Sequence, residues 1–266
     1  MAFDLDRIGG PTALAALIDE TLAAGEDALH LYRAGAANRT KVKPDRSPVT
    51  EADEAVEKRL LKYLQKRYPE AAFLGEETGA AGPSEAGLRW VVDPIDGTRA
   101  FIRGIPTWSI LIGLEAEGVP VVGIAYMPAD DDLYVAVDGQ GATANGRSLR
   151  VSNVASLADA CISHGALAQF TDLDLGHVLP RLGERTYTQR GFADFDGYRQ
   201  LLRGRVDAMI DPGVAPWDIC PAAVMVREAG GQLTSLAGEP TIHAGGAIAS
   251  NGQMHDALVN LVAEPA

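Results

Sequence analysis

The 266-residue chain is 47% hydrophobic and 22% charged, which is ordinary for a globular protein with a substantial core. Its 23 basic and 36 acidic residues leave a net charge of −13, which argues against nucleic acid or an anionic membrane surface as a partner. No run approaches 18 consecutive apolar residues and the N-terminus lacks a signal-peptide pattern, so we expect a cytoplasmic protein without membrane spans.

The first quarter of the chain predicts two amphipathic helices separated by a loop. Residues 11–33 place their apolar side chains mainly along one face of a helix. Residues 34–49 contain two prolines and predict a loop that has room for a hairpin. Residues 50–68 repeat the helical spacing, and Thr50 precedes Asp53 by three positions, as in a capping box.

The middle of the chain predicts short strands joined by turns, and the last third predicts alternating strands and helices. The first strands are expected at 72–74, 88–92, 109–115, 121–127 and 133–137, followed by a hairpin in 141–152. Later helices are expected at 196–203, 217–229 and 252–262, and later strands at 205–210 and 246–250. The change of pattern predicts an N-terminal α+β half, 1–152, and a C-terminal α/β half, 153–266.

Five acidic residues stand at the ends of predicted strands or the starts of predicted helices, where they can converge on one crevice. They are Asp53, Glu76, Asp93, Asp96 and Asp218. Taken alone, Asp53 and Asp218 are better explained as acids that favour a helix start, and Glu76 as part of a solvated turn.

The run Asp93-Pro94-Ile95-Asp96-Gly97-Thr98 is the sharpest signal in the sequence. Two carboxylates three residues apart on a tight turn can bridge or flank hard cations, and oxygen ligands with water are what Mg²⁺ prefers. Gly97 lets the backbone approach a ligand, and Thr98 can open a short helix whose N–H groups bind phosphate oxygens. A structural turn is the better explanation of an isolated DxxD, but not of the whole stretch 93–101.

Four segments, in this order, resemble the inositol monophosphatase family of lithium-sensitive, Mg²⁺-dependent phosphatases. They are PVTEAD (48–53), LGEE (74–77), DPIDGTRAF (93–101), and PWDICPAA (216–223) followed by EAGG (228–231). The resemblance covers nearly the whole chain. It implies an α+β fold of αβαβα layers with the site between the two halves, a small phosphorylated metabolite as substrate, and a homodimer.

The resemblance also implies which residues hold metal. Glu76, Asp93 and the backbone carbonyl of Ile95 would hold a first Mg²⁺. Asp93, Asp96 and Asp218 would hold a second. Mg²⁺ is therefore the expected cofactor.

Further residues are implied to act on water and substrate. Asp53 and Thr98 would form a dyad that orients and deprotonates the attacking water, and Glu76 would also act on that water. Gly97 and Thr98 would meet the phosphate. Lys43, or else Lys41, would reach the site from its loop.

The expected substrate is narrower than the family, because residues 93–114 and 194–218 look most like its histidinol-phosphate phosphatase branch. Inositol monophosphatases more often carry Asn where this chain has Ala100. Asp194 and Asp211 are expected to face the alcohol part of the substrate, where carboxylates would attract the ammonium and imidazole of histidinol phosphate. Carboxylates also accept bonds from hydroxyls, so inositol phosphate and sugar or nucleotide phosphates stay open. A non-catalytic phosphate-binding regulator is disfavoured, because binding alone needs no water-activating pair.

Overall fold

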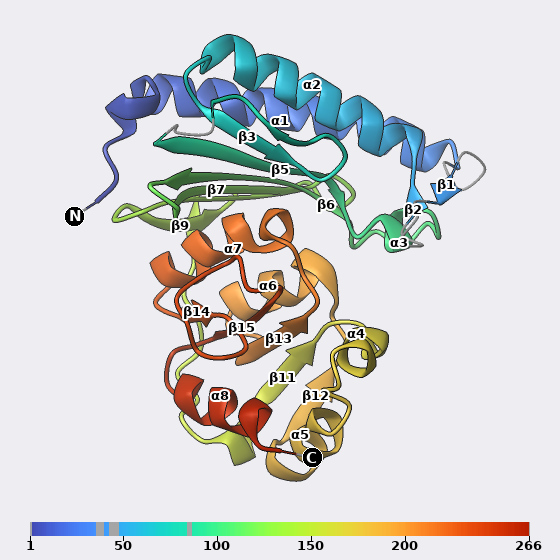
Figure 1. Ribbon diagram of the computed structural model, residues 1–266, viewed down its shortest axis with the longest axis vertical. Helices are drawn as coiled ribbons and strands as arrows, with labels where there is room; N and C mark the ends of the chain where they lie inside the picture. The colour runs from blue at the N-terminus through green and yellow to red at the C-terminus, as the bar shows by residue number, and fades with distance from the viewer. Residues whose placement is uncertain (1, 36–39, 43–47, 84–86, 266) are drawn as a thin grey trace.

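Helices and sheets alternate in five layers, in the order αβαβα (Figure 1). This computed structural model describes residues 2–35, 40–42, 48–83 and 87–265. The outer helical layer next to the first sheet holds α1 (Gly10–Arg33) and α2 (Glu51–Arg67), and the central helical layer holds α6 (Asp194–Leu202) and α7 (Pro216–Glu228). The opposite outer layer holds α5 (Val178–Arg185) and α8 (His255–Ala263), with α4 (Leu167–Asp172) at its side. The predicted fold class is confirmed.

The first sheet has eight strands in the order β10-β9-β8-β7-β6-β5-β3-β4. Their bounds are β3 (Ala72–Gly75), β4 (Gly79–Ala81), β5 (Leu88–Asp96), β6 (Ser109–Ala116), β7 (Val119–Met127), β8 (Asp132–Val137), β9 (Gly141–Ala144) and β10 (Arg147–Ser148). Among the described strands of this sheet, only β3 and β5 are parallel neighbours. Since parallel strands end at the same edge, the residue after β3, Glu76, is brought beside the end of β5.

The second sheet has five strands in the order β12-β11-β13-β15-β14. Their bounds are β11 (Cys161–His164), β12 (Thr188–Arg190), β13 (Ala208–Pro212), β14 (Gln232–Thr234) and β15 (Gly246–Ser250). The predicted division at residue 152 falls between the two sheets. It stays a prediction, because α7 packs against strands of both sheets.

Helix α7 approaches the first sheet closely because two of the facing residues are glycines. A Cβ at Gly113 on β6 would lie 2.3 Å from the Cys220 sulfur, and a Cβ at Gly123 on β7 would lie 2.5 Å from the Pro221 carbonyl oxygen. These are distances that real Cβ atoms do not show. The close packing of α7 places its first turn, with Asp218, at the end of β5.

The structure changes several predicted boundaries. Strand β5 continues through Asp96 instead of ending before Asp93, with a register shift between the two aspartates. The last strand before α7 is β13, Ala208–Pro212, so that it contains Asp211. The sequence predicts no helix or strand between residues 157 and 190. The elements found there, α4, α5, β11 and β12, are each too short to show a hydrophobic period.

Smaller elements complete the chain. In the region before α2, β1 (Lys41–Val42) pairs antiparallel with β2 (Pro48–Val49). Short helical turns lie at η1 (Leu5–Ile8), α3 (Thr98–Phe101) and η3 (Leu157–Asp159). Within the described residues, no helix is both long and apolar enough to cross a membrane.

Candidate active site

A cavity of about 560 Å³ lies where the end of β5 meets α3, α6, β13 and α7. Most of the residues predicted for the site line it, namely Glu76, Asp93, Ile95, Asp96, Gly97, Thr98, Asp194, Asp211 and Asp218. Asp53 is not part of this lining, but its Oδ1 atom lies 3.3 Å from the hydroxyl of Thr98, which is. Lys43 falls outside the described residues, and Lys41 binds Glu54 at 2.7 Å instead of lining the cavity.

Three aspartates converge at the floor of this cavity. One carboxylate oxygen from each of Asp93, Asp96 and Asp218 lies within 4.8 Å of the other two. Residues three apart on a regular strand point to opposite faces, and the register shift in β5 is what brings Asp93 and Asp96 together. The Ile95 N–H donates to Asp93 Oδ1 at 3.1 Å and stabilises this irregular turn.

Hydrogen bonds from three directions hold the other two carboxylates. Asp96 Oδ2 accepts from the Ser109 hydroxyl at 2.7 Å and from the Phe195 N–H at 2.9 Å. Asp218 Oδ2 accepts from the Ala215 N–H at 2.6 Å, as the acid of a capping box at the start of α7. The helix-cap explanation of Asp218 is therefore correct, and the same side chain also belongs to the acidic cluster.

The carboxylates of this cluster lie close together and repel one another. Burial, then the charges of Glu76, Asp96 and Asp218, hold the pKa of Asp93 well above its usual range. Burial also raises the pKa of Asp218 to about 7, against the lowering effect of the Ala215 N–H. Of the described residues that line the cavity, only Arg99 is basic. Buried, all-oxygen ligands that repel one another fit a hard divalent cation.

A second acidic group adjoins the first. Oxygens of Asp53, Glu76 and Glu77 lie within 4.8 Å of one another. Asp53 Oδ2 accepts from the N–H and hydroxyl of Thr50, at 2.8 and 2.6 Å, so the predicted capping box of α2 is present. Burial is the main cause that raises the pKa of Asp53 to about 6, with the Thr50 bonds lowering it and the charge of Glu76 raising it.

The Thr98 hydroxyl lies between two acceptors. It is 3.3 Å from Asp53 Oδ1 and 3.0 Å from the Ile95 carbonyl oxygen. A hydroxyl has one proton, so it donates to one of them at a time. Gly97, just before it, has φ +78°, a conformation that side chains rarely adopt.

The other side of the cavity carries Asp194 and Asp211. Tyr198 on α6 donates its hydroxyl proton to Asp211 Oδ2 at 3.2 Å. Burial raises the pKa of Asp211 well above its usual range, and the charges of Asp218 and Asp194 add to this. Asp194 has φ +56°, and a Cβ at Gly97 would lie 3.0 Å from its Oδ2 atom. A glycine at 97 therefore leaves room for the Asp194 carboxylate.

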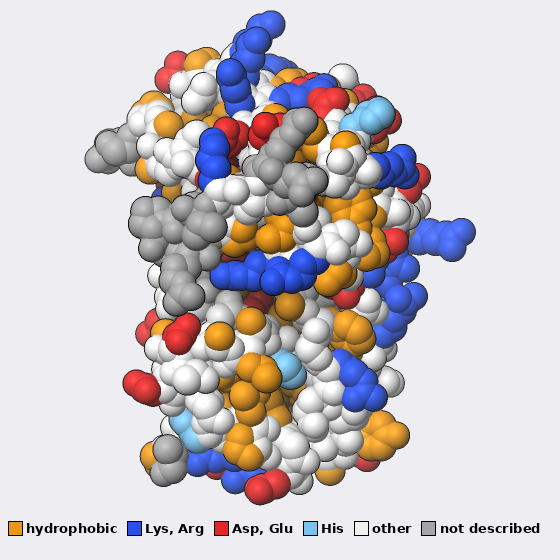
Figure 2. All heavy atoms as spheres, turned by 90° about the vertical axis from the view of Figure 1, so that its right-hand side faces the viewer, with side chains coloured by type: hydrophobic (Ala, Val, Ile, Leu, Met, Phe, Trp, Pro, Cys, Tyr) orange, Lys and Arg blue, Asp and Glu red, His pale blue; other side chains and the backbone are white. Residues whose placement is uncertain are grey.

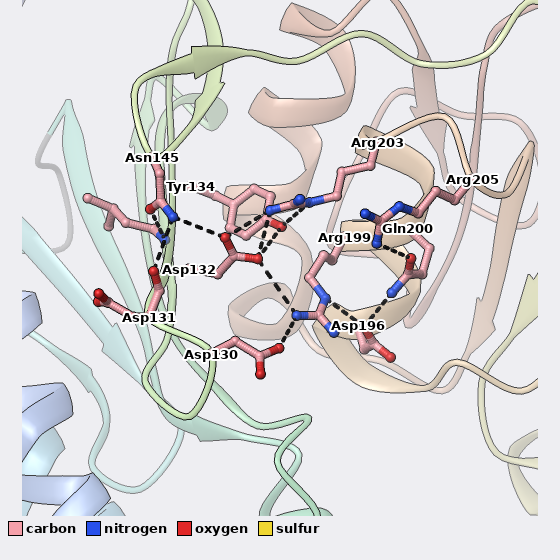
Figure 3. A network of polar contacts seen from close by, with 11 residues as sticks. Asp130, Asp131, Asp132, Tyr134, Asn145, Asp196, Arg199, Gln200, Arg203 and Arg205 are labelled. Carbon is pink, nitrogen blue, oxygen red and sulfur yellow. Dashed lines mark hydrogen bonds and ion pairs between the residues drawn. The ribbon is translucent and has the colours of Figure 1, made fainter.

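A network that the sequence did not reveal anchors α6 to the first sheet (Figure 3). Arg199 donates to Asp196 on its own helix at 2.8 Å and also bonds Asp130 in the β7–β8 turn. Arg203 binds both oxygens of Asp132 on β8, at 2.8 and 2.7 Å. These contacts hold the helix whose first turn supplies Asp194 and the Phe195 N–H. The three-residue spacing of Asp196 and Arg199 predicts an ion pair on one helix face. The bond from Arg199 to Asp130 on another element could not be read from the sequence.

Figure 2 shows the face of the molecule that carries α3 and α4. Basic side chains cross the middle of this face, and apolar side chains gather below them. Acidic side chains lie above and below this basic band in the same view.

Comparison with known proteins defines the class. The model of the inositol monophosphatase family matches residues 12–265. The crystal structure of extragenic suppressor protein suhB from Bartonella henselae superposes with a TM-score of 0.86 at 28% identity, covering 96% of this chain and 100% of that one. The chain belongs to the inositol monophosphatase family, and it is a metal-dependent phosphatase of small phosphorylated substrates.

Two relatives with named activities are similar to this chain over most of its length. Histidinol-phosphatase of Mycobacterium tuberculosis is 39% identical over 90% of this chain and 94% of its own length. Inositol-1-monophosphatase of Mesorhizobium japonicum is 34% identical over 82% of this chain and 83% of its own. Both are phosphoric monoester hydrolases, as is this enzyme.

Proposed function

We propose that this enzyme uses Mg²⁺ to hydrolyse L-histidinol phosphate to L-histidinol, a step of histidine biosynthesis. The observation that carries the substrate is the pair of carboxylates, half-buried Asp194 and buried Asp211, in the same cavity as the aspartate cluster. The higher identity to a histidinol-phosphatase also favours it. Inositol 1-phosphate is the second candidate, because a named inositol-1-monophosphatase is 34% identical.

The residues proposed to hold the metal are those of the floor of the cavity. Glu76, Asp93 and the Ile95 carbonyl would hold one Mg²⁺, and Asp93, Asp96 and Asp218 a second. Bound there, Mg²⁺ would neutralise the phosphate dianion, make a coordinated water a better nucleophile and stabilise the leaving alkoxide. The raised pKa values of Asp93 and Asp218 support this, because burial and neighbouring acids disfavour the charged form of both carboxyls and a bound cation would offset that cost.

Asp53 and Thr98 are proposed to accept the proton of the attacking water. With the Ile95 carbonyl engaged in metal binding, Asp53 is the remaining acceptor for the Thr98 hydroxyl. The water proton would pass to the Thr98 oxygen as the Thr98 proton passes to Asp53. A carboxyl with a pKa of about 6 can hold that proton close to neutral pH. Glu76, at the edge of both acidic groups, would orient the same water.

Discrimination between substrates would come from charge on the alcohol side. Asp211 is buried and Asp194 is half-buried, and a carboxylate shielded from water gains more from a cationic partner than an exposed one does. A carboxylate attracts a full positive charge more strongly than it attracts the dipole of a hydroxyl, and a hydrogen bond between charged groups contributes at least as much as the roughly 1.5–3 kcal/mol of a bond with one charged partner. An ammonium or imidazolium would therefore be favoured over a hydroxyl at the same place. Gly97 is proposed to meet the phosphate through its backbone, while its missing side chain leaves room for the Asp194 carboxylate.

The test is phosphate release from histidinol phosphate, inositol 1-phosphate, fructose bisphosphate and 3′-phosphoadenosine 5′-phosphate. Wild type should prefer histidinol phosphate. Asp194→Asn and Asp211→Asn should each lose about tenfold more kcat/KM for histidinol phosphate than for inositol 1-phosphate. Equal losses on both substrates, or a wild-type preference for inositol 1-phosphate, would overturn the substrate but not the phosphatase.

Metal dependence has its own measurement. Chelation should abolish turnover and added Mg²⁺ should restore it, because the proposed ligands are all oxygen atoms. Full activity in excess chelator would contradict the metal mechanism. The homodimer implied by the resemblance stays a prediction, which the mass in solution would test.

A further inference from the structure

Glu57 is a buried carboxylate that the proposed mechanism does not use. It lies one helical turn after Asp53 on α2, and only 1% of its surface is exposed. Its Oε2 atom accepts from the Glu77 N–H and its Oε1 atom from the Thr78 N–H, both at 2.8 Å. A buried carboxylate that accepts hydrogen bonds from two backbone N–H groups is held firmly in one position.

Those two N–H groups belong to the turn that carries Glu76. The turn connects β3 to β4, and β4 is the edge strand of the first sheet, paired with β3 alone. On the other side, the Glu76 N–H donates to the Val92 carbonyl of β5 at 3.2 Å. The turn is thus held by β5 on one side and by Glu57 on the other.

The residue before Glu76 shows how closely Glu57 is fitted. A Cβ at Gly75 would lie 2.5 Å from Glu57 Oε1 and 2.9 Å from the Thr78 hydroxyl oxygen. A side chain at position 75 would push the carboxylate away from the two N–H groups. The glycine is therefore needed because of what stands opposite it, since its own φ is not in the left-handed region.

We propose that Glu57 is a positioning residue that holds Glu76 beside Asp93 and thereby sets the affinity for Mg²⁺. The inference rests on the proposed function, in which Glu76 is a metal ligand. Asp53 and Glu57 stand four residues apart on α2, so one face of this helix supports two parts of the site. Asp53 reaches Thr98, and Glu57 reaches the turn of Glu76.

The perturbation must separate positioning from simple loss of stability. Glu57→Gln keeps the shape but presents an NH₂ group to one of the two N–H donors, so one bond is lost. Gly75→Ala keeps the carboxylate and displaces it. Glu20→Gln is the matched control, because Glu20 also bonds α2, through Arg59 Nε at 2.7 Å, away from the turn.

The measurement is calorimetric titration of the metal-free protein with Mg²⁺ alone, well below the unfolding temperature. Glu57→Gln and Gly75→Ala should each weaken Mg²⁺ binding by about 10- to 100-fold, as loss of an outer support for a metal ligand does. Glu20→Gln should bind as wild type. Turnover of Glu57→Gln should recover in part at high Mg²⁺.

A double variant gives the sharpest result. In the Glu57→Ala background the carboxylate is gone, so adding Gly75→Ala should weaken Mg²⁺ binding by much less than it does in wild type. The inference would be overturned if the losses of Mg²⁺ affinity from the two substitutions simply added, or if Glu57→Gln bound Mg²⁺ as wild type does. Asp93→Asn is the control for the proposed function, and it should lose Mg²⁺ binding in either case. If wild type itself bound no Mg²⁺, the proposed function would fail and the inference with it.

Discussion

Asp93→Asn is expected to stabilise the metal-free protein while it removes activity. Asp93 is 2% exposed, and its carboxylate oxygen lies within 4.8 Å of oxygens of Asp96 and Asp218. Asparagine has the same shape, and its Oδ1 can still accept the Ile95 N–H that Asp93 accepts at 3.1 Å. The substitution therefore removes one charge from a repulsive group, and it replaces a carboxyl that shares hydrogen bonds with Glu76 and Asp218 by an amide that can donate to them.

The magnitude follows from Coulomb's law. Two full charges at this separation repel by roughly 3–4 kcal/mol at an effective dielectric constant of about 20. Proton uptake relieves part of this, since the pKa of Asp93 is raised by burial and by its acidic neighbours. We expect a net gain of about 1–3 kcal/mol, or roughly 2–10 °C in the melting temperature of a chain of this size.

Two thermal scans and one kinetic assay measure the outcome. In chelator, Asp93→Asn should melt above wild type. In Mg²⁺, wild type should gain stability and Asp93→Asn should gain much less, and its phosphate release should fall nearly to zero. Asp174→Asn is the control, because Asp174 is exposed and its φ of +58° suits asparagine.

Two results would refute this reasoning. A melting temperature that falls in chelator, with the far-ultraviolet spectrum unchanged, would show that the cluster is not repulsive. Wild-type turnover in a folded Asp93→Asn protein would show that the metal site lies elsewhere.

Three further predictions concern other residues. Thr98→Ala should lower kcat by about 100- to 10,000-fold, as loss of a proton-transfer partner does, and a rate within threefold of wild type would exclude Thr98 from that role. Arg199→Met should cost about 2–3 kcal/mol in urea unfolding, because it leaves Asp196, which is 5% exposed, without its cationic partner, whereas Arg185→Met at the surface should cost much less. Burial lowers the pKa of His255, so the folded state favours the neutral ring, and stability should fall as the pH drops below the unfolded value of about 6.5. Unfolding measured at pH 7.5 and 5.5 should show a smaller loss for His255→Gln than for wild type, and equal losses would contradict the assignment.

The parts of the site that the sequence identified are those whose functional residues are close neighbours in the chain. Asp93, Asp96, Gly97 and Thr98 occupy one strand end and the turn that follows it, so a single short run carries their relative placement. The sequence of residues 93–98 therefore predicts that these four residues line one cavity. The register shift in β5 is less visible, because whether a strand continues past a proline depends on the neighbouring strand β6.

Helix Asp194–Leu202 shows where sequence reasoning stopped. Its acids suggested a substrate contact, but nothing local indicated that Arg199 would bind Asp130, which lies 69 residues earlier. Nor did the sequence indicate that the Phe195 N–H would hold Asp96, which is 99 residues away. Such pairs depend on the packing of α6 between two sheets, and no periodicity records them.

The sequence by itself contained the acidic run at the centre of the site and the motifs whose resemblance to a known family implies the class of this protein and its layered fold, because each motif is written in neighbouring residues. Tertiary structure alone decided what supports that run. Glu57 has the sequence pattern of an ordinary helix acid, and it becomes a support for Glu76 only because α2 lies against the β3–β4 turn. Gly75, Gly113 and Gly123 likewise matter for what faces them. The physical reason is that burial and close approach arise between distant segments, and they exist only once those segments are packed together.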